Sequence, residues 1–154
     1  MIPFSHRSRP RASGSRPLFV AERQSALLMC FVTATLAVMS FLHLSGVLDS
    51  GTKPFERSDA GIAEAVICVV LGYGAAGLLR RRSRARTVAL AATGFAILGF
   101  LVGLRFTLQG GDAIDIAYHL SALPILVIAL IGLLRTRARS TRRKTIHPNR
   151  MTSS

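Results

Sequence analysis

The chain has 154 residues, half of them hydrophobic, and a formal net charge of +13 that is concentrated in a few short segments. A water-soluble domain mixes charges along its length, whereas here no Asp, Glu, Lys or Arg lies between Arg23 and Asp49. This segregation argues against a soluble enzyme, and the sequence has no nucleophile elbow, phosphate-binding loop or HExxH motif that would support one.

The chain begins with a basic segment, residues 1–24, which is rich in Arg, Ser and Pro and has no helical apolar pattern. Such a composition predicts a disordered arm. The apolar run that follows, 25–48, is longer than the hydrophobic region of a secretory signal and has no clear cleavage site. We therefore expect it to remain as a first membrane span.

Three further apolar segments follow the first, and polar or basic turns separate them. About 20 apolar residues are enough to cross a hydrocarbon core of roughly 30 Å, so each segment qualifies as a span. The sequence predicts an all-α, four-helix transmembrane bundle over residues 25–135, with a disordered basic tail at 136–154. The expected spans are 25–48, 60–79, 87–108 and 113–134.

The distribution of basic residues predicts the orientation. They gather before the first span, in the loop 80–86 and after the fourth span, while six of the seven acids lie at the opposite end. The positive-inside rule then places both termini and the 80–86 loop in the cytoplasm. Arg greatly outnumbers Lys and Ala is abundant, which is typical of a GC-rich bacterial genome. We expect a multi-pass protein of the bacterial cytoplasmic (inner) membrane.

The basic residues also raise the question of a nucleic-acid partner. They are juxtamembrane and have almost no aromatic residues among them, which favours attraction to anionic lipid at the cytoplasmic face over nucleic-acid binding. Gly99 and Gly103 form a small-x3-small pattern in the third span, and such patterns allow two helices to approach closely. We expect packing within one chain, with a homo-oligomer or another membrane protein as the alternative.

Each span carries ionisable residues one to two turns inside its outer end. They are His43 in the first span, Glu64 in the second, Arg105 in the third, and Asp115 with His119 in the fourth. A charged group near the centre of a bilayer costs about 2.5–3.5 kcal/mol on insertion scales, so such groups usually pair or face a cavity. The spacing of Asp115 and His119, four residues apart, places both on one helix face.

The polar layer admits several hypotheses. It can line an outward-facing pocket for a proton, an ion or a small lipophilic molecule, to which Tyr118 would also contribute. His43 and His119 can instead ligate a haem or a metal ion. The chain can also be a non-catalytic accessory subunit that receives another membrane protein. A purely structural alternative is a Glu64–Arg105 salt bridge between two spans, with Tyr118 as an interfacial anchor.

Four stretches carry a resemblance to a known group: HLSGVLDSG (43–51), FERSDAGIAE (55–64), GFLVGLRFTLQGGD (99–112) and DIAYH (115–119). The chain resembles small uncharacterised four-span integral membrane proteins of GC-rich bacteria, over roughly residues 25–135. The resemblance implies a four-helix bundle and carries over no catalytic residue. In size and topology the chain is also similar to DoxX-type and small multidrug transporter proteins, but it lacks the early-span Glu with neighbouring aromatic residues that is expected of the latter.

The predicted orientation can be tested by thiol labelling in a background without Cys30 and Cys68. A cysteine placed at Ser50 should react with a reagent that cannot cross the membrane, because the 49–59 loop is expected outside. A cysteine at Ser83, within the basic loop, should react only after the membrane is permeabilised. Labelling of position 83 but not position 50 in intact cells would reverse the orientation.

Overall fold

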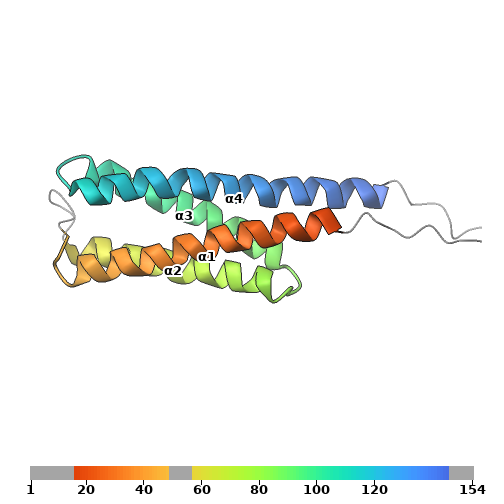
Figure 1. Cartoon of the computed structure of the whole chain (residues 1–154), viewed down its shortest axis with the longest axis horizontal. Helices are drawn as coiled ribbons and strands as arrows, with labels where there is room; N and C mark the ends of the chain where they lie inside the picture. Colours follow the sequence, from red (N-terminus) through yellow and green to blue (C-terminus); the bar gives the residue numbers. More distant parts are fainter. Residues whose placement is uncertain (1–15, 49–56, 146–154) are drawn as a thin grey trace, which may run out of the picture.

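A computed structural model describes the backbone of residues 16–48 and 57–145, and the side chains of 20–48 and 59–135. The described residues form four helices and no strand: α1 (Arg16–Leu44), α2 (Arg57–Leu79), α3 (Ala85–Thr107) and α4 (Ala113–Thr145) (Figure 1). Each contains a segment long and apolar enough to cross a membrane, namely Val20–Leu44, Asp59–Leu79, Ala85–Thr107 and Ala113–Arg135. The predicted all-α four-helix bundle is confirmed.

Two helices extend beyond the expected spans. α1 begins at Arg16, inside the arm 1–24 that was expected to be disordered, and α4 continues to Thr145, well into the tail 136–154. Extending an existing helix is much easier than starting one, since each added residue gains a hydrogen bond without a new nucleation cost. Pro17 is compatible with the helix because it lies in the first turn, where no backbone donor is required. The remainder of both tails, 1–15 and 146–154, lies outside the described residues.

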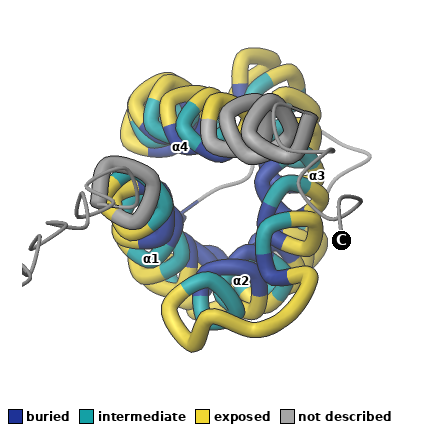
Figure 2. Tube along the Cα trace, turned by 90° about the vertical axis from the view of Figure 1, so that its right-hand side faces the viewer, coloured by how far each residue is buried: buried dark blue, intermediate teal, exposed yellow. Residues whose placement is uncertain are grey.

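The four helices form a closed ring in chain order. α1 packs against α2, α2 against α3, α3 against α4, and α4 against α1. Figure 2 shows that the buried residues of all four helices lie on the side of each helix that faces the centre of this ring. The start of α1, the end of α4 and the α2–α3 connection lie at one end of the bundle, while the end of α1, the start of α2 and the α3–α4 connection lie at the opposite end (Figure 1). This arrangement places the basic 80–86 loop beside the two helix ends.

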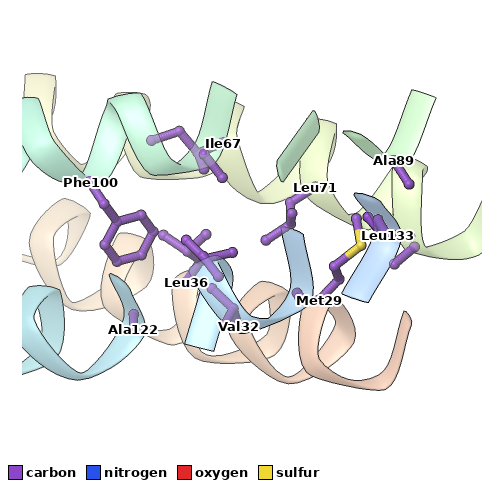
Figure 3. Packing of buried hydrophobic residues seen from close by; sticks show 13 residues of the cluster. Met29, Val32, Leu36, Ile67, Leu71, Ala89, Phe100, Ala122 and Leu133 are labelled. Atoms are coloured by element: carbon purple, nitrogen blue, oxygen red, sulfur yellow. The ribbon is translucent and has the colours of Figure 1, made fainter. Parts of the chain in front are cut away.

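The interior of the ring is an apolar core to which every helix contributes. Leu36, Leu71, Phe100 and Leu126 are each at most 1% exposed, and Figure 3 shows side chains from the four helices meeting along the bundle axis. The outer surface is also apolar, with large hydrophobic residues such as Val69 more than two-thirds exposed. An apolar exterior around an apolar core is expected of a bundle whose solvent is lipid.

Small residues set the closest helix contacts. A Cβ atom built on Gly74 in α2 would lie 2.9 Å from the Cβ of Ala92 and 3.2 Å from the Cα of Ala89, both in α3. Gly99 in α3 accommodates the side chain of Ile67 in α2 in the same manner. Gly94, on α3, has open space around its missing side chain. Close backbone approach of this kind replaces the hydrophobic effect as the source of helix association in a bilayer.

Gly74 and Gly94 give a matched test of this packing. Gly74→Ala should lower the free energy of unfolding by about 1–3 kcal/mol, since the added methyl meets backbone atoms that cannot move aside. Gly94→Ala should be neutral or raise it by up to about 1 kcal/mol, because alanine favours the helix and meets nothing. Unfolding in mixed detergent micelles on addition of SDS measures both. Equal effects of the two substitutions would contradict the packing.

Candidate functional site

Four buried ionisable side chains meet near the end of the bundle where α1 ends, α2 begins and the α3–α4 connection lies. His43 comes from the last turn of α1, Glu64 from α2, and Asp115 with His119 from the first turns of α4. Their residues are between 1% and 7% exposed. These side chains lie close together because α1 ends and α4 begins at the same level of the ring. We call these four residues the polar cluster.

His43 and Glu64 are joined by a direct hydrogen bond. Nδ1 of His43 lies 2.8 Å from Oε2 of Glu64, a length typical of a charge-assisted bond. A carboxylate has no hydrogen to give, so Nδ1–H donates and the imidazole is fixed with its Nε2 atom directed elsewhere. The nearby hydroxyl of Ser40 donates to the backbone oxygen of Gly61 at 2.7 Å and holds α1 against α2 at the same level.

Asp115 is held by groups from two helices. The hydroxyl of Thr107 in α3 lies 3.0 Å from Oδ2 of Asp115 and 2.9 Å from the backbone oxygen of Gly103. Since a hydroxyl has one hydrogen, these two acceptors share it. Nδ1 of His119 lies 2.9 Å from the backbone oxygen of Asp115, towards which its hydrogen points, and 3.1 Å from the Oδ1 atom. The Asp115 carboxylate is therefore held between Thr107 of α3 and His119 of its own helix.

A gap separates the two halves of the polar cluster. Nε2 of His43 lies 3.8 Å from Oδ2 of Asp115, which is too long for a hydrogen bond. Among the described residues, neither Nε2 of His43 nor Oδ1 of Asp115 has a hydrogen-bond partner, although both atoms are buried. Buried polar atoms without partners are rare, and each suggests either a bound species or a functional role.

Aromatic and glycine residues enclose the His119 side. The Phe100 ring packs 5.2 Å from the His119 ring and 5.5 Å from that of Tyr118, measured between centroids. Gly103 lies against Nε2 of His119, and a methyl group at this position would overlap the imidazole. Tyr118 belongs to the edge of this region. Its hydroxyl lies 3.1 Å from the hydroxyl of Thr35 in α1 and does not bond the polar cluster.

Arg105 does not join the polar cluster. It is exposed, it does not line the cavity described below, and Glu64 bonds His43 in its place. The predicted Glu64–Arg105 salt bridge is therefore wrong. The reason is helix register: on α3 the residues that face the ring interior at this level are Gly103 and Thr107, and position 105 falls between them on the outer side. The depth of a residue within its span does not determine which face of the helix it occupies.

A cavity of about 500 Å³ adjoins the polar cluster between α2 and α3. This volume falls within the range of about 300–1,000 Å³ that is usual for small-molecule sites. Most of its walls are apolar, and the residues at its outer edge, including Ala63, Val66, Leu98 and Val102, are exposed on the surface that would face lipid. Its polar end is formed by His43, Glu64, Asp115, His119 and Thr107.

Sequence reasoning did not find several of these residues. Thr107 and the cavity walls were missed, because a hydroxyl in a span is ordinarily satisfied by its own helix and apolar wall residues resemble any others. One signal was available: Thr107 lies four positions after Gly103, so both occupy the same face of α3. Comparisons with protein-family models, curated proteins and solved structures give no match for this chain.

A double-mutant cycle tests the His43–Glu64 contact. His43→Leu or Glu64→Leu alone leaves the other polar group buried without its partner, whereas the double variant removes both. The coupling in the free energy of unfolding should be about 1–2 kcal/mol, near the upper end for polar pairs in membrane proteins. Glu64→Leu combined with Arg105→Gln serves as the control and should be additive within about 0.5 kcal/mol. Coupling between Glu64 and Arg105 together with additivity between His43 and Glu64 would instead support the salt bridge predicted from sequence.

Proposed function

We propose that this chain is a multi-pass membrane protein that binds a small lipophilic molecule from the bilayer between α2 and α3. The observation that carries the proposal is a single cavity that is apolar at its exposed edge and polar at its buried end. A cavity bounded only by core residues would serve packing alone. One that combines a lipid-facing apolar mouth with four convergent ionisable groups has the composition of a ligand site.

The position of the mouth supports entry from the side. Val66 in α2 is 49% exposed, and Leu98 and Val102 in α3 are 64% and 53% exposed, all on the outer surface of the bundle. In a bilayer these side chains contact acyl chains, so a ligand reaches the cavity without crossing water. The apolar part of the ligand would lie along α2 and α3, and its polar end would reach the polar cluster.

The chemistry of the polar end narrows the ligand class. None of the described residues that line the cavity is Lys or Arg, while two are carboxylates. An anionic head would therefore meet repulsion and no cationic partner. Imidazole and carboxylate together provide donors and acceptors for a neutral oxygen. We therefore assign the ligand to neutral lipophilic molecules with a hydroxyl or carbonyl group at one end.

The proposed setting is the bacterial cytoplasmic membrane, with the polar cluster towards the outer leaflet. It is supported by the position of the basic α2–α3 connection, where Arg80, Arg81, Arg82 and Arg84 are exposed at the same end as the start of α1 and the end of α4. Such an end suits an anionic cytoplasmic leaflet, which attracts each surface Lys or Arg by about 1 kcal/mol. The other end would then hold the cavity mouth in the outer leaflet.

Photolabelling with and without an occluded cavity tests the proposal. The probe is a long-chain alcohol with a diazirine near its hydroxyl, presented to the protein in lipid nanodiscs, with labelled positions mapped by mass spectrometry. Label should concentrate on cavity-lining residues of α2 and α3. Val102→Trp should reduce that labelling about 10-fold, since overpacking of about 1–3 kcal/mol corresponds to such a change in occupancy.

The neighbouring position gives the control. Leu101 is 50% exposed on α3, close to the 53% of Val102, but it does not line the cavity. Leu101→Trp should therefore leave the labelling pattern unchanged. Label spread evenly over the lipid-facing residues of all four helices, or an equal response to the two tryptophan variants, would refute binding in the cavity.

A further inference from the structure

The unpartnered Nε2 atom of His43 faces the Asp115 carboxylate, whose nearer oxygen, Oδ2, also accepts from Thr107. Nε2 belongs to His43, whose residue is 1% exposed, and the opposing carboxylate belongs to Asp115, which is 2% exposed. His43 gives its Nδ1 hydrogen to Glu64, so a neutral ring directs the Nε2 lone pair at the Asp115 carboxylate. Two electron-rich atoms directed at each other in a membrane interior repel, unless something electropositive lies between them.

The distance limits what that species is. A shared proton requires a separation below about 3.2 Å between nitrogen and oxygen, and 3.8 Å exceeds it. A bridging water with two hydrogen bonds of about 2.8 Å near the tetrahedral angle requires a separation of about 4.6 Å. Two bonds of about 2.1 Å to one metal ion span 3.8 Å at an angle of about 130°. The gap therefore matches a metal ion best.

Charge and donor types agree with the distance. Among the described residues, His43, Glu64 and Asp115 each offer one ligand atom, and the three atoms lie within 4.8 Å of one another. Two carboxylates and a neutral imidazole carry two negative charges, which a divalent ion neutralises, and no Lys or Arg among the described lining residues does so. Nitrogen and oxygen donors without a thiolate are typical of ions such as Mn²⁺, Fe²⁺ and Zn²⁺.

The surrounding contacts are those of a supported metal site. A histidine that binds a metal usually donates its other ring hydrogen to a carboxylate, as His43 does to Glu64, and a carboxylate ligand is usually held by a further donor, as Thr107 holds Asp115. Glu64 bonds the side of the imidazole opposite Nε2, so it orients His43 and does not itself bind an ion held at Nε2. His119 positions Asp115, and its own Nε2 lies against Gly103. The two imidazoles thus have different roles, unlike the paired axial ligands of a haem.

We infer that Nε2 of His43 and the Asp115 carboxylate, with Glu64 orienting His43, form a site for a divalent first-row transition metal ion at the buried end of the cavity. These two protein ligands leave coordination positions for the cavity, where the hydroxyl or carbonyl oxygen of the lipophilic ligand would bind. This last point rests on the proposed function. The metal site itself depends only on the polar cluster, so the two are tested separately.

Co²⁺ is a suitable probe because its visible spectrum reports coordination number. The protein is purified in mild detergent through a tag without histidine, in a His6→Ala, His147→Ala background, treated with a chelator and titrated with Co²⁺. We expect one ion per chain and the visible absorption of a four- or five-coordinate site. Zn²⁺ should displace the Co²⁺ and abolish that absorption.

Matched variants assign the ligands. Asp115→Asn and His43→Gln should weaken Co²⁺ binding more than about 100-fold, which exceeds the roughly 10–100-fold loss expected when a residue only orients a ligand. Glu64→Gln should weaken Co²⁺ binding by only about 10–100-fold, since Glu64 orients His43 without binding the ion. Tyr118→Phe, which alters a neighbour outside the polar cluster, should leave the affinity unchanged. Circular dichroism and gel filtration show which variants are folded. If a variant does not fold, the Co²⁺ titration of the protein with the unsubstituted polar cluster still tests the metal site.

Two outcomes would overturn the metal site: no stoichiometric Co²⁺ binding to the folded protein, or binding that persists in both folded Asp115→Asn and folded His43→Gln. Val102→Trp separates this inference from the proposed function, because it fills the apolar mouth and should leave Co²⁺ binding intact. Loss of alcohol labelling without loss of Co²⁺ binding is the pattern we expect for that variant. Normal alcohol labelling of a folded protein that binds no Co²⁺ would refute the metal site without contradicting the proposed site for a lipophilic molecule.

Discussion

The structure depends on one constraint: ionisable groups inside a lipid-facing bundle must be satisfied by other protein groups. His43 and Glu64 share a 2.8 Å hydrogen bond, and Asp115 accepts from Thr107 beside the neighbouring His119, which leaves Nε2 of His43 and Oδ1 of Asp115 without a hydrogen-bond partner among the described residues. Each contact joins or orients helix ends at one level, so the same contacts that satisfy charge also set the register of the ring. Water would have satisfied these groups in a soluble protein and left the helices free to shift.

Much of the fold follows from the sequence because a bilayer permits few alternatives. Apolar length identifies the four spans, and the backbone cannot be anything but helical within them. The common depth of His43, Glu64 and Asp115 was likewise visible, since depth is counted from the ends of the spans. What the sequence could not specify is which residues share an inward face. An ideal helix turns 100° per residue, so Arg105 and Thr107, two positions apart, lie on nearly opposite sides.

The partner of a buried group is harder to predict than its burial. Their opposite formal charges predicted a salt bridge between Glu64 and Arg105. Arg105 is exposed on the outer side of α3, however, and its guanidinium does not reach the ring interior. A histidine from the end of α1 reaches it because α1 and α2 are neighbours around the ring. The cavity depends on another property absent from sequence patterns, the separation of α2 and α3 at the level of Val102. The walls of the cavity are ordinary apolar residues. Their arrangement in space forms the site, and their residue types alone do not indicate it.

The polar cluster is divided between two helical hairpins. His43 and Glu64 lie on α1 and α2, while Thr107, Asp115 and His119 lie on α3 and α4, and each set is hydrogen-bonded within its own hairpin. Within the polar cluster as the structure describes it, the 3.8 Å gap between His43 and Asp115 lies between the two hairpins, while the Thr35–Tyr118 contact joins them outside the cluster. Each hairpin can therefore enter the membrane during synthesis with each of its ionisable side chains already in contact with one partner. An ion bound in the gap would join the two halves, so its binding would be thermodynamically linked to their assembly into one bundle.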